Sequence, residues 1–279
     1  MIPNPIRKVL SSMRAHRVRA LLMGGQACVF YGAAEFSRDT DFAILPNPEN
    51  LGRLRKALQD LSAGPIAVPP FELKFLRKGH AIHFRCLHPE ASRIRLDVMS
   101  KMRGVDSFEK LWKRRTTLGL PNGETCDLMS LPDLVLAKKT QRDKDWPMIR
   151  RLVEANFFGN RRNPGTPQIR FWLRELRTPE LLVEVTKHNL KLARQLVQKR
   201  PLLQSALTGQ IEKLTDELFA EEFAEREKDR LYWLPLKKEL EQLRHSKALK
   251  RRVEHGEQAN RQAIPFRIGK DGRDTKDKR

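Results

Sequence analysis

Hydrophobic and polar residues follow two different periods along the first half of the chain. Short apolar or alternating runs predict strands at 18–23, 39–45, 81–87 and 93–99. Spacings of three and four residues predict helices at 5–16, 26–31, 49–62, 130–140 and 146–155. A weaker hairpin is expected to turn at Pro121-Asn122-Gly123, because Asn-Gly between extended segments is a strong turn signal. This mixture predicts an α/β (α+β) domain over residues 1–155, with a mixed sheet and flanking helices.

The pattern changes beyond this domain. Residues 156–167 concentrate Gly, Pro and Asn, which predicts a linker. Helical spacing then dominates and predicts an all-helical domain over 168–245, with helices at 181–197, 211–227 and 236–249. From 246 to 279 the apolar periodicity is lost and basic residues dominate, so we expect a basic, disordered tail.

Charge narrows the choice of partners. The 279 residues include 55 Lys and Arg against 34 Asp and Glu, a formal net charge of +21. This balance favours a polyanion, with nucleic acid ahead of a membrane surface; the alternative is that basic residues only solubilise the helices. Aromatic residues make up 7% of the chain, too few to favour a stacking platform for single strands, so a folded RNA fits better.

Cysteine usage and hydropathy suggest where the protein resides. Three cysteines without CxxC spacing are typical of reduced, buried thiols. No apolar run approaches 18 residues, and the N-terminus lacks the apolar core of a signal peptide. We therefore expect a cytoplasmic protein without a membrane partner.

Two aspartates stand out in the strand at 39–45. Aspartate is depleted in strands, and alternation places Asp39 and Asp41 on one face, roughly 6.6 Å apart. Such a pair can hold Mg²⁺ ions for displacement at phosphorus, because hard cations prefer carboxylate oxygens. The alternative is an exposed edge strand on which Asp39 pairs with Arg38. Asp97 favours the metal site, because it would place a third carboxylate on a neighbouring strand.

A glycine pair lies just upstream. Gly24 and Gly25 join a predicted strand to a predicted helix, where the missing Cβ atoms let the backbone approach a ligand closely. A helix N-terminus also favours phosphate. Tight strand-to-helix turns use glycine for steric reasons alone, so the pair carries weight only together with the aspartates.

Together these residues resemble the nucleotidyltransferase superfamily. The similarity consists of Met23-Gly24-Gly25, a spacer, Asp39-Thr40-Asp41-Phe42, and Asp97 as the third carboxylate. The stretch from Phe36 to Phe42 is similar to the branch containing AbiEii-type toxins of type IV toxin–antitoxin systems. The resemblance implies that Asp39, Asp41 and Asp97 are catalytic and that they bind two Mg²⁺ ions.

The resemblance also extends to residues that would bind the nucleotide. It implies contacts to the triphosphate from Gly24, Gly25 and Ser37. The segment 133–145 is similar to a later element of the same branch, and there Lys138, Arg142 and Asp145 would bind the nucleotide. A turn hydroxyl at Ser37 and a solvated lysine at Lys138 are the alternatives.

The expected activity is therefore transfer of NMP from an NTP to a hydroxyl acceptor, with two Mg²⁺ ions as cofactors and RNA, such as tRNA, as the acceptor. A toxin would also have a cognate antitoxin. Two departures weaken the toxin assignment: Thr40 replaces an aliphatic residue, and the helical half matches no toxin subfamily. The alternatives are a small acceptor such as an aminoglycoside, or a non-catalytic, basic RNA-binding protein.

Two further clusters contain residues that can bind metal or nucleic acid. His80, His83 and His88 with Cys86 lack the paired spacing of a zinc site, so an ordinary polar strand is expected there. The basic run at 250–252 could clamp an RNA backbone, but we favour a solvated tail.

Overall fold

The computed structural model describes residues 4–120 and 123–262, with side chains described as far as residue 249. Within them, seven strands form one sheet in the order β3-β4-β5-β2-β1-β7-β6. The strands are β1 (Ala20–Met23), β2 (Asp39–Ile44), β3 (Gly64–Pro65), β4 (Ile82–Arg85), β5 (Arg95–Met99), β6 (Thr116–Gly119) and β7 (Thr125–Leu128). The β2–β5 and β1–β7 pairs are parallel and the other pairs are antiparallel. The predicted mixed sheet is confirmed.

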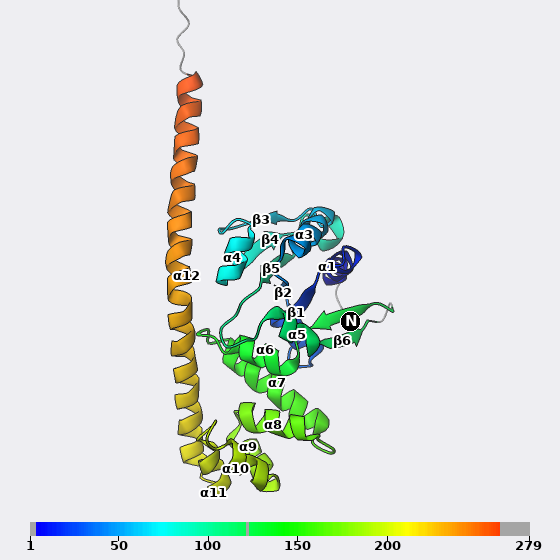
Figure 1. The fold of residues 1–279 in the computed structure, drawn as a ribbon, viewed down its shortest axis with the longest axis vertical. Coiled ribbons are helices and arrows are strands. Elements are labelled where there is room, and N and C mark those ends of the chain that lie inside the picture. Colours follow the sequence, from blue (N-terminus) through cyan, green and yellow to red (C-terminus); the bar gives the residue numbers. More distant parts are fainter. Residues whose placement is uncertain (1–3, 121–122, 263–279) are drawn as a thin grey trace, which may run out of the picture.

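Helices flank this sheet (Figure 1). They are α1 (Asn4–Ala15), α2 (Gly24–Phe30), α3 (Pro48–Asp60), α4 (Leu73–Lys78), the 3₁₀ helix η1 (Pro89–Ala91), α5 (Phe108–Lys113), α6 (Leu131–Lys138) and α7 (Asp145–Asn160). Their starts follow local capping chemistry: Asn47 accepts a hydrogen bond from the Asn50 N–H at α3, and Ser130 accepts one from the Asp133 N–H at α6. Apolar side chains of the strands, such as Leu22 and Leu96, are fully buried.

The rest of the described chain is helical, as predicted. It contains α8 (Thr166–Glu175), α9 (Pro179–His188), α10 (Leu190–Leu196), α11 (Leu203–Thr208) and α12 (Ile211–Gln262). Figure 1 shows α12 running along one side of the molecule, with its C-terminal end standing clear of the sheet domain. In the described part of the chain, no helix is both long and apolar enough to cross a membrane.

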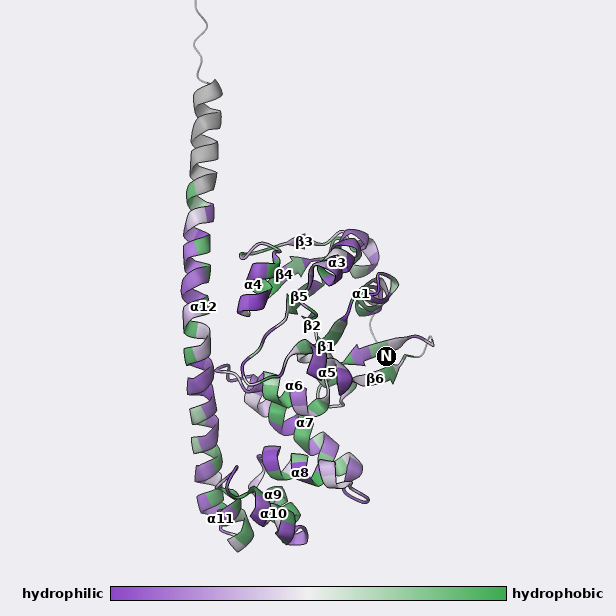
Figure 2. Ribbon diagram, viewed as in Figure 1, coloured by the Kyte–Doolittle hydropathy of each residue, from purple (hydrophilic) through white to green (hydrophobic). Residues whose placement is uncertain are grey.

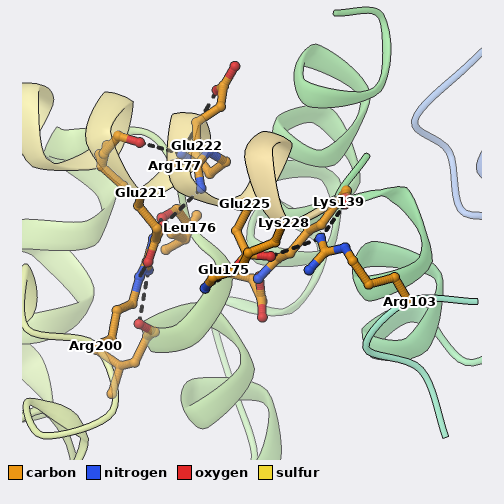
Figure 3. A network of polar contacts seen from close by, with 12 residues as sticks. Arg103, Lys139, Glu175, Leu176, Arg177, Arg200, Glu221, Glu222, Glu225 and Lys228 are labelled. Carbon is orange, nitrogen blue, oxygen red and sulfur yellow. Dashed lines mark hydrogen bonds and ion pairs between the residues drawn. The ribbon is translucent and has the colours of Figure 1, made fainter. Parts of the chain in front are cut away.

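Buried arginines attach α12 to the helices before it (Figure 3). Arg200 is 5% exposed; it donates to the carbonyls of Leu173 and Leu176 and pairs with Glu221 at 2.9 Å. Arg177 also pairs with Glu221 at 2.9 Å. Because both guanidiniums reach the same carboxylate, the first turns of α12 are fixed against α8 and the turn that follows it.

The expected linker at 156–167 is shorter in the structure. α7 continues to Asn160 and α8 begins at Thr166, so only residues 161–165 connect them. The reason is that Phe157 is buried and meets the Trp172 ring edge-on, with centroids 5.1 Å apart. A segment with the composition of a loop therefore contributes to the core.

Helix boundaries in the C-terminal half also differ from the prediction. The expected helix at 181–197 is divided at Asn189 into α9 and α10, whereas those at 211–227 and 236–249 form one helix that continues through Pro235. α12 also extends through 246–262, where we expected disorder; Lys, Arg, Glu, Gln and Ala in this stretch all favour helix. Residues 263–279, the rest of the expected tail, lie outside the described residues, as do Pro121 and Asn122 in the predicted hairpin turn.

Candidate active site

Strand register brings the three predicted carboxylates to one face of the sheet. Asp41 of β2 lies opposite Asp97 in the parallel pair with β5, and opposite Met23 in the antiparallel pair with β1. Asp39 lies two residues before Asp41 and therefore on the same face. All three line a cavity of about 560 Å³, together with Gly24. The predicted sharing of one face is confirmed.

The glycine corner makes room for Asp41 and Ser37. Gly24 has φ +67°, and a Cβ at this position would lie 1.8 Å from Oδ2 of Asp41. A Cβ on Gly25 would lie 2.6 Å from Oγ of Ser37. The Gly25 N–H donates to the Asp41 carboxylate. Gly24 thus lets the start of α2 sit directly against the β2 carboxylate, whereas Gly25 leaves room for Ser37, and all three residues line the cavity.

Asp41 is in an electrostatically unfavourable position. Burial, followed by the negative charges of Asp97 and Asp39, raises the pKa of its carboxyl group to about 6. Lys138 and the Gly25 N–H act in the opposite direction but do not cancel this effect. The protein therefore supplies less positive charge around Asp41 than its ionised form requires.

Asp97, by contrast, already has partners on its own sheet. Arg95 approaches its Oδ2 at 2.8 Å, and Nδ1 of His83 lies 2.9 Å from its Oδ1. Burial acts to raise the pKa of Asp97, but the hydrogen bonds from His83 and Arg95 outweigh it, so the pKa is lowered. His83 and Arg95 also line the cavity, a role that the sequence analysis missed.

The predicted ligand set is not assembled around a metal position. Among the described residues, no group of three or more His, Cys, Asp or Glu side chains is arranged so that it could hold a metal ion. The pairing of Asp97 with Arg95 and His83 gives a physical reason, because both of its oxygens already accept hydrogen bonds from cationic or polar groups. Asp39 and Asp41 remain the carboxylates of the cavity whose oxygens suit a hard cation.

The later predicted element forms a second charged cluster in the cavity wall. Asp145 is 2% exposed and accepts hydrogen bonds from Lys138 at 3.2 Å, Thr140 at 2.6 Å and Arg142 at 2.8 Å. Burial acts to raise the pKa of Asp145, but the charge of Lys138 and the other partners lower it overall. Lys138 is itself 9% exposed, so the alternative of a solvated lysine is wrong.

Helix α12 completes the wall of the cavity. Asp229 and Trp233 line it, and the buried Asp229 accepts a hydrogen bond of 2.9 Å from the Gln141 N–H. Arg103 lies 3.5 Å from the same carboxylate. Neither Asp229 nor Trp233 could be predicted for the site from the sequence, because neither residue type nor spacing in α12 carries a signal for the chemistry of the sheet.

No protein-family model and no curated protein matches this sequence.

Proposed function

We propose that the protein is a Mg²⁺-dependent nucleotidyltransferase that transfers NMP from an NTP to a hydroxyl group of RNA. The observation that carries the proposal is that Asp39 and Asp41 share one face of the sheet beside the glycine corner, in a cavity of about 560 Å³. Cavities of roughly 300–1,000 Å³ are the usual size for small-molecule and cofactor sites. A carboxylate whose charge the protein leaves uncompensated is suited to a cation that arrives with a substrate.

Asp39 and Asp41 fit Mg²⁺ by donor type and by charge. Both supply carboxylate oxygens, and a divalent cation would offset the burial and the repulsion from Asp97 and Asp39 that together raise the pKa of Asp41. When bound, Mg²⁺ would neutralise phosphate charge and make the acceptor hydroxyl easier to deprotonate. A role for Asp97 as a third ligand would require it to share its oxygens with Arg95 and His83.

Positive groups on other walls of the cavity suit a triphosphate. Lys138 and Arg142 line it beside Asp145, and Arg95 lines it beside Asp97. Fixed cations placed near phosphate oxygens stabilise the charge that is redistributed during phosphoryl transfer. The chain itself can therefore orient the triphosphate, while the backbone at Gly24 and Gly25 allows close approach.

An RNA acceptor is supported by the overall charge of +21. The charge of the cavity argues against an aminoglycoside, which is a polycation: its wall contains five Asp side chains, but also six Lys and Arg side chains. A purely RNA-binding scaffold would gain nothing from the uncompensated carboxylates. The toxin role, and an antitoxin with it, rests on the resemblance at residues 36–42 alone.

Transfer of label tests the proposal. The wild-type protein is incubated with total RNA, Mg²⁺ and each α-³²P-labelled NTP in turn, and the RNA is separated on a gel. We expect label in a defined RNA band with one or more NTPs. Asp41→Asn should lower transfer by about 10³-fold or more, because the charge that a cation would bind is removed.

The matched control is Asp216→Asn, which removes an exposed carboxylate from α12. It should transfer label at the wild-type rate. Absence of label with all four NTPs, or equal labelling by wild type and Asp41→Asn, would contradict the proposal.

A further inference from the structure

Helix α12 extends well past its attachments to the rest of the molecule. Among the described residues, the last side chain of α12 that pairs with the sheet domain is Glu239, which contacts Lys78 at 2.6 Å and His80 at 2.9 Å. The helix then continues to Gln262. At about 1.5 Å per residue, these 23 residues form an arm roughly 35 Å long. Figure 1 shows the C-terminal end of α12 standing clear of every other element.

The sign of the charge reverses where this arm, residues 240–262, begins. The packed part of α12, residues 211–239, contains nine Asp and Glu against six Lys and Arg. The arm contains six Lys and Arg against three Asp and Glu, and residues 263–279 have the same six against three. The acidic charge of the packed part pairs with buried arginines such as Arg177 and Arg200 (Figure 3). Arg244 and Lys247, the cationic residues of the arm whose side chains the structure describes, are both exposed.

The pattern of apolar residues on the arm disfavours a membrane or a coiled-coil partner. Both would require an apolar stripe along one helix face. Leu240 and Leu243 lie on one side of a helix with 3.6 residues per turn, whereas the helical positions of Leu249 and Val253 lie on the other. Figure 2 shows mixed rather than one-sided hydropathy along the coloured part of the arm. A net positive arm without a continuous apolar stripe suits a polyanion better than an apolar partner.

The arm also starts close to the candidate active site. Asp229 and Trp233, within three turns of its first residue, line the cavity. A polyanion lying along the arm would therefore have one end near the carboxylates of β2. We propose that the arm binds the phosphate backbone of the acceptor RNA and guides an RNA end into the cavity; this inference rests on the proposed function.

Binding of RNA to the full-length protein tests the arm. The variant replaces Lys247, Lys250, Arg251 and Arg252 with Gln, which has a similar helix propensity. The control replaces the exposed Lys187, Lys191, Arg194 and Lys199, in and just after α9 and α10, with Gln and removes the same charge. Affinity for a fluorescein-labelled tRNA transcript is measured by anisotropy between 50 and 200 mM KCl without nucleotide. Circular dichroism checks that both variants keep their helix content.

For the arm variant we expect a Kd increase of about tenfold or more, and a salt slope smaller by about two to four, since each lost phosphate contact lowers the slope by about one. The control should change the Kd by less than about threefold. Unchanged affinity of the arm variant, an equal loss in the control, or no binding by the wild type would overturn the proposal. Equally tight binding of duplex DNA would overturn the assignment to RNA.

The outcome is separate from that of the transferase assay. Weak RNA binding by the arm variant, with no transfer by the wild type, would support the arm and contradict the proposed activity. Transfer by the wild type together with full RNA affinity in the arm variant would support the proposed activity and contradict the proposed role of the arm.

Discussion

Two aspartates face the same cavity in opposite electrostatic states. Asp145 is surrounded by Lys138, Thr140 and Arg142, and its pKa lies below the ordinary value. Asp41 is held in a buried position close to Asp97 and Asp39. Burial and these two negative charges raise the pKa of its carboxyl group to about 6. The protein neutralises one carboxylate with its own side chains and leaves the other uncompensated.

The difference separates a structural cluster from a candidate binding site. Asp145 holds the start of α7 to the end of α6 through Lys138 and Arg142, and the same pairings fix these two cations in the cavity wall. Strongly perturbed carboxylates in a cleft are, in contrast, typical of functional sites. The nucleotide-binding role predicted for Asp145 therefore has less physical support than the role predicted for Asp41.

Removing the neutralised carboxylate should have the largest effect on stability. Asp145→Ala leaves the buried Lys138 without its partner, and we expect a loss of about 3–5 kcal/mol in the free energy of unfolding. Because the pKa of Asp145 is lower in the folded protein, this contribution is present at neutral pH and is lost as the pH falls below about 4. Urea unfolding at pH 7 and pH 3.5 measures both.

Asp143→Ala is the control, since its side chain is 94% exposed and its ion pair with Arg226 is therefore screened by solvent. It should change the free energy of unfolding by less than about 0.5 kcal/mol. If Asp145→Ala were as stable as this control but failed to bind nucleotide, Asp145 would be a ligand contact rather than a structural group.

A side chain at the glycine corner should disturb the uncompensated cluster. Gly24→Ala places a Cβ against Oδ2 of Asp41 at a residue with φ +67°, so we expect a loss of about 2 kcal/mol and weaker binding of Mg²⁺ with NTP. Thermal unfolding and isothermal titration measure the two effects.

Gly52→Ala is the matched control, because Gly52 lies within α3 and a Cβ there meets nothing within 4 Å. It should stabilise the protein by about 0.5–1 kcal/mol and leave titration with Mg²⁺ and NTP unchanged. If Gly24→Ala bound Mg²⁺ and NTP as the wild type does, binding would not depend on the present position of the Asp41 side chain.

Weakening the attachment of α12 to the sheet domain should have the smallest effect on the free energy of unfolding. Glu239→Gln weakens the contacts to Lys78 and His80, and we expect a loss of about 1 kcal/mol. The pKa of Glu239 is lowered, chiefly by the hydrogen bond with His80, so the loss should fade as the pH drops below about 4.5. Glu241→Gln, at an exposed position, serves as the control; an equal effect of both changes would show that the Glu239 contacts do not hold α12.

The sequence predicted the part of the site that depends on local periodicity. Alternation along two strands placed Asp39 and Asp41 together and set Asp97 on the polar face of its strand, and the structure confirms this arrangement. The pairing of His83 with Asp97 could not be read from the sequence, because it depends on the register between β4 and β5.

Helical composition was less informative about the second half. Apolar spacing predicted separate helices at 211–227 and 236–249, yet α12 runs through both, including Pro235, which cannot donate a backbone hydrogen bond. Tyr232 and Leu236 on either side lie near Gly79 of the sheet domain, so tertiary contacts there outweigh local preference. The placement of Trp233 at the cavity follows from that packing and has no local signal.

The ionisation of Asp41 tests the account most directly. In protein labelled with ¹³C at the aspartate carboxyl carbons, with Asp41→Asn to assign the signal, NMR follows the carboxyl shift as a function of pH. We predict a titration midpoint of about 6 without metal, and a clearly lower midpoint when Mg²⁺ and an NTP are present. A midpoint near 4 that does not respond to Mg²⁺ would contradict an uncompensated carboxylate at this site.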